Sequence, residues 1–289
     1  MLKTLFGVAP QEEPDGSFRP SRLALKLGTA PVTDYRPVSY DVYRGARSRI
    51  LVLFTEEKNL TMANGRAFST GNHPVEALVP MLHLRSAGFD FDVVTPTGRP
   101  VVFEEWALPT ADDAVMGLHA DLRDRFEQPT PLSEALEGLD GDAAHQIAAV
   151  FIPGGHGALI GLPEDERVGA LLRWAHEHGR LTISICHGPG ALLATTLGDH
   201  DFPYAGYEMA VFPDTVDRQA PWIGYLPGPM PWHLGERLAA LGVQLANTKA
   251  DDTCCIDRDL ITGASPAASN KLGRLAAESL LSTLSAAGL

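Results

Sequence analysis

The chain has few cysteines, no long apolar run and no excess of basic residues, and each shortage excludes a class of protein. Three cysteines in 289 residues are too few for a disulfide framework, and no basic-then-apolar signal segment opens the chain, so we expect a reducing, cytoplasmic setting. No apolar run reaches the roughly 20 residues that cross a bilayer, so we expect no membrane partner. A net charge of -13 disfavours nucleic acid, because phosphate binding needs a basic face.

The residues that are abundant indicate an α/β protein. The chain is 45% hydrophobic and 20% charged, as is typical of a globular domain. Short runs rich in β-branched residues predict strands at 50–55, 91–95, 147–153, 181–186, 207–212 and 259–263. Apolar residues at helical spacing predict helices at 73–88, 167–179, 233–242 and about 266–286. This alternation predicts a mostly parallel sheet with helices on both faces.

Two segments do not follow the alternation of strands and helices. Residues 1–48 carry scattered Pro, Gly and Arg without a sustained period, which predicts an irregular N-terminal arm or lid. Residues 97–145 are too long for a simple connection and are partly helical by pattern, so we expect an inserted small subdomain that shapes a site or an interface. The remainder of 49–289 is predicted to be one catalytic domain.

The most informative stretch is "LTISICHGPG", in which a predicted strand ends at Cys186 and His187 follows at once. Functional crevices of parallel sheets lie at the carboxyl ends of the strands. A tight strand-to-helix turn there, with Ser184 and Gly188 at the crowded flanking positions, resembles a nucleophile elbow. The helix N-terminus is expected to favour the thiolate. A buried, inert cysteine is the alternative, but the adjacent histidine and the glycines favour a nucleophile.

His187 is the candidate base for Cys186, and it needs a carboxylate to fix its tautomer. Two aspartates follow the next predicted strand, Asp214 and Asp217, and the pattern alone does not choose between them. Either of them can instead be a turn residue that bonds its own backbone.

Two further features are expected at the same edge of the sheet. Gly154 and Gly155 in "PGGHGA" leave their N–H groups unobstructed, and with the N–H of His187 they are candidates for an oxyanion hole. Glu76 lies in the first turn of a predicted helix, after Pro74. Its carboxyl group either caps this helix or hydrogen-bonds the thiol of Cys186, and both alternatives remain open.

Five motifs together carry a specific resemblance: "NGRAFSTGNHPVE", "FIPGGHGALIGLPE", "ISICHGPGALL", "FPDTVDRQ" and "LITGASPAASNKLG". In this order and spacing they resemble the ThiJ/PfpI superfamily, and within it the HchA-type heat-shock proteins, over roughly residues 35–288. The resemblance implies a flavodoxin-like sandwich, a homodimer and a Cys-His-acid triad. By motif, the triad falls on Cys186, His187 and Asp217, with Glu76 beside the thiol and the N–H groups of Gly155 and His187 facing the oxyanion.

The resemblance also implies a function, because HchA-type proteins are described as glyoxalase III, protein deglycase and holding chaperone. We therefore expect a cofactor-independent enzyme that converts methylglyoxal or glyoxal into 2-hydroxy acids, or that deglycates aldehyde-modified protein or nucleotide, through a cysteine nucleophile. One alternative is a holding chaperone for unfolded proteins. Another is an amidase or peptidase, since a Cys-His-Asp set also serves acyl transfer.

One part of the family pattern is missing. Bacterial members of the family carry a site of two histidines and one carboxylate, whose positions here hold Arg85, Asp90 and Leu122. Arginine and leucine do not ligate a divalent metal in an ordinary site, so we predict that this protein lacks the metal. His83 and His119 lie nearby, but isolated histidines on such segments are usually structural.

Two remaining features have weaker interpretations. Cys254 and Cys255 are adjacent in "DDTCCIDRD", which is predicted to be a surface hairpin, and a disulfide between neighbours would be strained. We expect both to be incidental. The stretch "EEWALP" at 104–109 and the aromatic-rich stretch 220–236 are candidate walls of the crevice.

Overall fold

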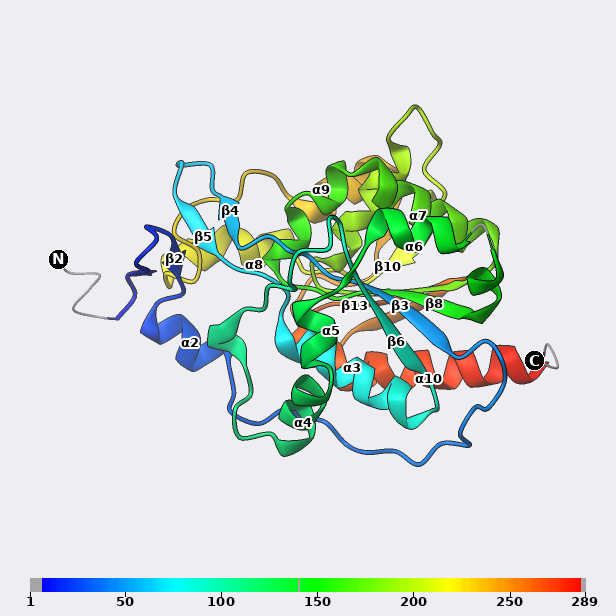
Figure 1. Cartoon of the computed structure of the whole chain (residues 1–289). Helices are drawn as coiled ribbons and strands as arrows, with labels where there is room; N and C mark the ends of the chain where they lie inside the picture. Colours follow the sequence, from blue (N-terminus) through cyan, green and yellow to red (C-terminus); the bar gives the residue numbers. More distant parts are fainter. Residues whose placement is uncertain (1–6, 140, 287–289) are drawn as a thin grey trace.

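The structure is a computed structural model that describes residues 7–139 and 141–286 (Figure 1). Its centre is a seven-stranded sheet built from β3 (Arg49–Leu53), β6 (Asp90–Thr95), β7 (Thr130–Pro131), β8 (Ile147–Ile152), β9 (Leu181–Ile185), β12 (Cys254–Asp257) and β13 (Leu260–Gly263). The strand order is β12-β13-β9-β8-β3-β6-β7. Neighbouring strands pair in parallel from β13 to β7, whereas β12 pairs with β13 in an antiparallel hairpin. The mostly parallel sheet predicted from the sequence is confirmed.

Helices cover both faces of this sheet (Figure 1). One face packs against α3 (Pro74–Ser86), α4 (Asp113–Asp121), α5 (Arg123–Glu127) and α10 (Ser269–Ala286). The other face packs against α6 (Leu132–Leu139), α7 (Glu166–Glu177), α9 (Leu234–Ala240) and the 3-10 helix η5 (Gly188–Thr196). Alternation along β3 supplies both cores, because Ile50 and Val52 point to the first face and Leu51 and Leu53 to the second. The flavodoxin-like sandwich is thereby confirmed.

The strand predicted at 207–212 is mostly absent. Only β10 (Glu208–Met209) forms, and it pairs with β11 (Gln244–Leu245) outside the main sheet. The next two amides donate to side chains instead of a strand, Ala210 to Thr262 Oγ1 at 2.8 Å and Val211 to Asn247 Oδ1 at 3.0 Å. Side-chain acceptors therefore end the strand two residues after it begins.

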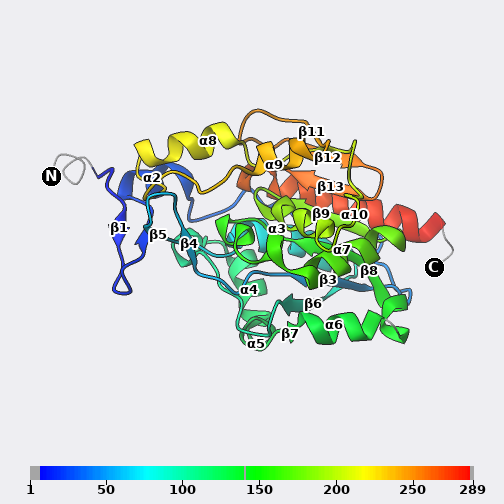
Figure 2. The same cartoon turned by 90° about the horizontal axis from the view of Figure 1, so that it is seen from above.

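The N-terminal arm is more ordered than its sequence predicts. It contains β1 (Gln11–Glu12), β2 (Phe18–Arg19) and α2 (Arg22–Gly28). Its hairpin joins β4 (Asn59–Thr61) and β5 (Ala67–Ser69) in a second sheet of order β1-β2-β5-β4 (Figure 2). The expectation that regular structure begins only after residue 48 is therefore wrong, because elements this short show no period in the sequence. Residues 29–48 are irregular.

The segment 97–145 is partly helical, as its pattern predicts. It contains η1 (Glu105–Ala107), α4, α5, β7, α6 and the start of η2 (Asp142–Gln146). Residues 1–6 of the predicted arm, residue 140 of the predicted insertion and residues 287–289 of the predicted domain lie outside the described residues. Within the described ranges, no helix combines the length and the apolar character that crossing a membrane requires.

Candidate active site

Cys186 lies at the carboxyl end of β9 in a backbone conformation that few residues adopt. Its φ is +59°, in the left-handed region that disfavours residues other than glycine. Two backbone hydrogen bonds hold the turn: the Cys186 N–H donates to Gly263 O at 2.8 Å, and the Phe212 N–H donates to Cys186 O at 3.0 Å. The turn therefore fixes the direction of the thiol.

The residues that flank the turn are small because the backbone is crowded there, as the sequence predicts. Ser184 donates through Oγ to Ile152 O at 3.1 Å. A Cβ atom added at Gly188 would lie 2.5 Å from Ser184 Oγ and 2.6 Å from Ile152 O. Gly188 therefore has no room for a side chain.

The prediction of a helix N-terminus that favours the thiolate is wrong in two respects. The helix after the turn is the 3-10 helix η5, whose first turn contains Gly188 and Gly190, residues of low α-helix propensity. In addition, burial and the neighbouring carboxyl group of Glu76 raise the pKa of the Cys186 thiol well above its usual range. The resting group is therefore a neutral thiol that needs a base.

A line of hydrogen bonds joins the thiol to an aspartate. Cys186 Sγ lies 3.3 Å from His187 Nδ1, and His187 Nε2 lies 2.8 Å from Asp217 Oδ2. All three residues are buried. Since the carboxylate accepts at Nε2, the proton of the neutral ring resides there and Nδ1 is free to accept the thiol proton. Burial, reinforced by a second histidine, His156, lowers the pKa of His187 and favours this neutral form.

The structure separates the two aspartates that the sequence left open. Both lie on α8 (Asp214–Gln219), and Asp217 is the one that bonds His187. Asp214 instead accepts from the backbone N–H groups of Gly235 and Glu236 at 2.8 and 2.9 Å. It thereby pairs amides at the start of α9.

His156 is a buried member of this cluster that the sequence predictions do not include. It opens η3 (His156–Leu159), directly after the glycine pair at the end of β8. Its Nε2 lies 3.0 Å from Asp217 Oδ1, and its ring centroid is 4.0 Å from that of His187. Its place at the carboxyl end of a predicted central strand was the signal that could have identified it.

Glu76 lies beside the thiol and is fully buried in the first turn of α3. Neither of its carboxyl oxygens makes a hydrogen bond of ordinary geometry with a described residue. Burial raises its pKa well above the usual range, although the Cys186 thiol and the Gly155 amide lie close enough to moderate the effect. Burial therefore favours the neutral carboxylic acid form of Glu76 next to the nucleophile.

Glu104 is a second buried carboxyl group near the cluster, and the sequence predictions do not include it either. Its Oε1 accepts from Thr70 Oγ1 at 2.6 Å, and burial raises its pKa to about 7. It faces His156, whose proximity opposes that rise. The sequence analysis placed its segment, 104–109, in a candidate crevice wall but gave Glu104 itself no role, because it follows no predicted strand.

The glycine pair at the end of β8 fits between Glu76 and the thiol. A Cβ atom at Gly154 would overlap Glu76 Oε2 and lie 2.7 Å from Cys186 Cβ. Gly155 has φ of +103°, which requires glycine, and its amide lies close enough to Cys186 to hold down the pKa of the thiol. The Gly155 amide, one of those predicted to face an oxyanion, thus lies near the sulfur.

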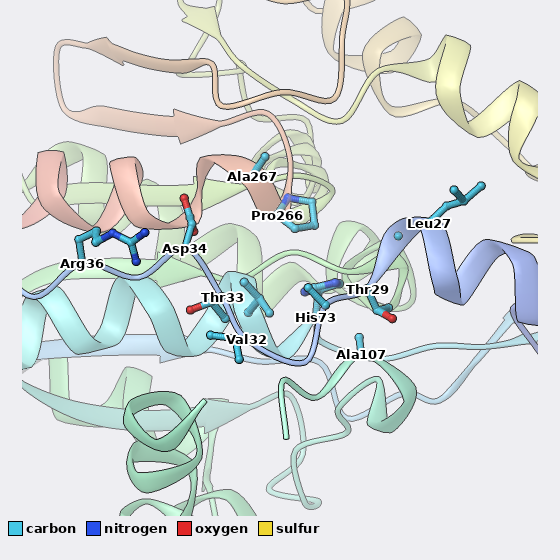
Figure 3. Close-up of a pocket in the computed structure, with 13 residues that line it drawn as sticks. Leu27, Thr29, Val32, Thr33, Asp34, Arg36, His73, Ala107, Pro266 and Ala267 are labelled. Atoms are coloured by element: carbon cyan, nitrogen blue, oxygen red, sulfur yellow. The ribbon is translucent and has the colours of Figure 1, made fainter. Parts of the chain in front are cut away.

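A cavity of about 530 Å³ opens beside this cluster. Its lining includes His73, Phe212, Asp217, Trp222, Tyr225 and Pro266. A neighbouring cavity of about 580 Å³ lies between the N-terminal arm and α3, and both cavities share Leu27 and His73 (Figure 3). The aromatic stretch 220–236 therefore contributes to a crevice wall, as predicted.

The positions of the family's metal site have other partners here. Arg85 Nη1 pairs with Asp121 at 2.9 Å, Asp90 pairs with Arg125 at 2.7 Å, and Leu122 is buried. These residues do not form a metal site, although the absence of metal from the protein remains a prediction.

The two nearby histidines also have structural surroundings. His83 bonds Tyr40 Oη at 2.8 Å through Nδ1 and Asn270 Oδ1 at 2.9 Å through Nε2. His119 packs against the rings of Phe103 and Phe126. Both are therefore placed as structural residues.

Among the described residues, one group of three potential ligands is compact, namely His156, His187 and Asp217 within 4.8 Å of one another. The same atoms already form two hydrogen bonds of ordinary length. Protons account for this geometry without a metal ion, so we assign no metal here.

Comparison with known proteins identifies the family of this chain. The DJ-1/PfpI family model matches residues 68–201. Over 268 residues the chain is 45% identical to the protein/nucleic acid deglycase HchA of Escherichia coli O1:K1, covering 92% of this chain and 93% of that protein. The chain belongs to the DJ-1/PfpI family. The resemblance inferred from the motifs is confirmed.

Solved structures share the fold of this family member. The rapid encystment protein of Francisella tularensis has a TM-score of 0.68 at 16% identity, covering 81% of this chain and 99% of that one. A glyoxalase III from Candida albicans has a TM-score of 0.60 at 19% identity, covering 80% and 98%. At these identities the likeness concerns the fold alone.

Proposed function

We propose that this protein is a cofactor-independent enzyme that removes 2-oxoaldehydes, free or as adducts on protein or nucleotide, by converting the aldehyde unit into a 2-hydroxy acid. The observation that carries the proposal is the line from Cys186 Sγ through His187 to Asp217, with bonds of 3.3 and 2.8 Å beside a protonated Glu76. Identity of 45% to a protein/nucleic acid deglycase supports it.

In the first step the Cys186 sulfur attacks the aldehyde carbon while His187 Nδ1 takes the thiol proton. The carbonyl π electrons move to oxygen, and protonation of this oxygen completes a hemithioacetal. The N–H groups of Gly155 and His187 are the proposed donors to the oxyanion, because both belong to residues that adjoin the sulfur. Gly154 leaves room for this arrangement, since any side chain there would displace Glu76.

In the second step a proton leaves the former aldehyde carbon and another reaches the neighbouring keto carbon through an enediol. The first carbon is thereby oxidised to a thioester and the second is reduced to an alcohol, so no external electron acceptor is needed. His187, neutral again once it has passed the thiol proton to the oxygen, can accept this proton, and Glu76, as a carboxylic acid, carries it by donating its own proton as it accepts the new one. Glu76 suits this role because neither of its oxygens has a partner of ordinary geometry in the described part of the chain.

In the last step water attacks the thioester and releases the 2-hydroxy acid and the free Cys186 thiol. An adduct on protein or nucleotide differs only in the first step of this sequence. The sulfur replaces the amine or thiol at the carbinol carbon, restoring the unmodified side chain and giving the same hemithioacetal.

Protein groups and water supply every step, so we expect neither an organic cofactor nor a metal. One equivalent of metal bound in purified active protein would contradict this expectation.

Replacement of the nucleophile tests the proposal. Cys186→Ala should abolish formation of 2-hydroxy acid from methylglyoxal and release of amine from a glycated peptide, both followed by chromatography. The matched control is Cys254→Ala with Cys255→Ala, which removes the other two free cysteines and should retain activity. Turnover by Cys186→Ala, or cleavage of simple peptide amides by the intact protein in place of aldehyde turnover, would refute the proposal.

A second candidate function is holding unfolded chains, and exposed apolar side chains favour it. Leu27 is 68% exposed and Trp222 73% exposed, and both line the 530 Å³ cavity. Such side chains suit binding of unfolded polypeptide by a cytoplasmic homodimer. Trp222→Ser should weaken suppression of aggregation and keep aldehyde turnover. Cys186→Ala should abolish aldehyde turnover and keep suppression of aggregation. Joint loss of both activities in each variant would contradict two separable functions.

A further inference from the structure

Asp217 is hydrogen-bonded by two histidines rather than one. Oδ2 lies 2.8 Å from His187 Nε2, and Oδ1 lies 3.0 Å from His156 Nε2. The side chain of His156 is 4% exposed and that of Asp217 is 3% exposed. The nucleophile and its base account for only one side of the carboxylate, and the other side is held by a residue with no role in the proposed reaction.

We propose that His156 is a positioning residue for the proposed reaction: it bears the positive charge opposite Asp217 and holds that carboxylate so that His187 remains the neutral acceptor of the thiol proton.

The first support is the orientation of the two rings. His187 bonds the thiol through Nδ1 and the carboxylate through Nε2, whereas the hydrogen bond of the His156 ring is to Asp217. Only His187 therefore lies between the sulfur and the carboxylate. His156 can act on the thiol solely through Asp217 and through its charge.

The second support is that the two rings compete for one proton. Their centroids are 4.0 Å apart, so protonation of both would place two positive charges in contact in a buried site. One carboxylate can offset one of these charges. The ring that holds the proton therefore decides whether a neutral base remains beside Cys186.

The third support is the set of groups that face His156. They come from several elements and are Asp217, His187, Glu104, His73 and Tyr225. Burial alone would lower the pKa of His156, but the carboxylates of Asp217 and Glu104 outweigh burial and raise it. Burial lowers the pKa of His73 to about 3, so this ring is neutral. Asp217 acts on both rings, so Glu104, which faces His156 alone of the two, is the group that directs the proton to His156 and not to His187.

Nuclear magnetic resonance of the imidazole nitrogens tests this assignment without requiring turnover. The full-length protein, labelled with ¹⁵N-histidine, is titrated, and the two rings are assigned from the signals missing in His156→Gln and His187→Gln. We expect His156 to remain protonated at higher pH than His187. In His156→Gln, which keeps a donor to Asp217 but no charge, the titration of His187 should move to higher pH.

Either of two results would overturn the proposal: a wild-type His187 that protonates at higher pH than His156, or a His187 titration unchanged by His156→Gln. If His156→Gln does not fold, as judged by circular dichroism, the His156 signal is assigned from its loss in His156→Phe, and the wild-type order then decides the question. Failure of the proposed enzymatic function would leave these titrations unaffected, so the two hypotheses fail separately.

Kinetics supply the second readout. For His156→Gln, kcat/KM should stay within about threefold of wild type at pH 9. At pH 6 the ratio of variant to wild type should be roughly tenfold lower than at pH 9, which corresponds to a change of about one unit in the pKa of His187. For His156→Phe, which also removes the donor, we expect a loss of about tenfold or more at both pH values. The control His176→Gln removes a histidine bonded to Asp259 outside the site and should leave the profile unchanged. Equal losses at both pH values in His156→Gln would indicate a merely structural residue.

Discussion

Two aspartates at opposite ends of the central sheet bind histidines, and they serve different purposes. Asp217 contacts His187 just beyond the carboxyl end of β9, and both side chains are at most 3% exposed. Asp259 precedes the amino end of β13 and lies 2.8 Å from His176 Nδ1, with side chains 19% and 31% exposed. The residue types and distances are the same, so the pairing itself does not make a site.

The surroundings account for the difference. The second oxygen of Asp259 accepts from Tyr207 Oη at 2.6 Å, and the pair ties α7 to the start of β13. The second oxygen of Asp217 accepts from another histidine, and one of its two histidines reaches a thiol. Burial, two competing bases and a nucleophile convert a structural pairing into a candidate catalytic one.

The largest expected contrast comes from removing each carboxylate. Asp217→Asn should lower kcat/KM about 10³- to 10⁴-fold, because His187 then loses the acceptor that fixes its tautomer. Asp259→Asn should change kcat/KM less than about twofold and lower the free energy of unfolding by about 1 kcal/mol, through weakened hydrogen bonds. Steady-state kinetics and urea titration measure both effects. Similar kinetic losses in the two variants would remove the distinction.

A smaller but still large effect is expected at Glu76. Glu76→Gln should lower kcat/KM roughly 10²-fold, the usual contribution of a proton-transferring group. The free energy of unfolding of the wild-type protein should fall as pH rises, and Glu76→Gln should remove this dependence. The folded protein keeps a proton that the unfolded chain releases above pH 4.5, so wild type loses stability as pH rises from there toward the folded pKa.

The glutamine side chain of the Glu76→Gln variant cannot release a proton. The free energy of unfolding of this variant should therefore rise relative to that of wild type between pH 5 and pH 8. Urea titrations at the two pH values measure the difference. A variant that loses stability relative to wild type as pH rises would show that Glu76 is ionised in the folded protein.

A moderate effect is expected from filling the gap at Gly154. Gly154→Ala would place a methyl group against Glu76 Oε2, so we expect roughly a tenfold loss of kcat/KM and a loss of about 1–3 kcal/mol of stability. The control is Gly117→Ala on α4, where no atom lies within 4 Å of the added carbon. It should stabilise the protein by about 0.5–1 kcal/mol without kinetic effect. Unaltered kinetics in Gly154→Ala would show that Glu76 does not need its present place.

The smallest effect concerns the pH profile of the wild-type enzyme. A free histidine titrates near pH 6.5, and burial together with His156 lowers the pKa of His187. The base is therefore still neutral at pH 6.5, and kcat/KM should change less than about twofold between pH 8 and 6.5 before it falls at lower pH. An acidic limb centred above pH 6.5 would contradict the lowered pKa.

The sequence predicted the elements with long or strongly apolar patterns. The central strands β3, β6, β8, β9 and β13 and the helices α3, α7, α9 and α10 lie where their patterns indicate. The two-residue strands β1, β2 and β7 and the short helix α2 were missed, because two to seven residues show no period. The strand expected at 207–212 is short because two side chains intercept its amides.

The site was predictable where its residues adjoin in sequence. Cys186 and His187 follow a strand, and the family motifs choose Asp217 over Asp214 for a contact that the structure then shows. His156 was missed although it follows a predicted strand, because its role depends on a contact with Asp217 across 61 residues, and Glu104 was missed because its place depends on a contact with Thr70 across 34 residues. The high pKa of the thiol was also missed, since it follows from burial in the folded protein.

Mass spectrometry of the protein during turnover of methylglyoxal tests the central claim most directly. The account predicts a covalent adduct with the mass of one methylglyoxal on the peptide that carries Cys186, absent from Cys186→Ala and decaying as the 2-hydroxy acid appears. Steady turnover without an adduct on Cys186, or with adducts confined to Cys254 and Cys255, would contradict it.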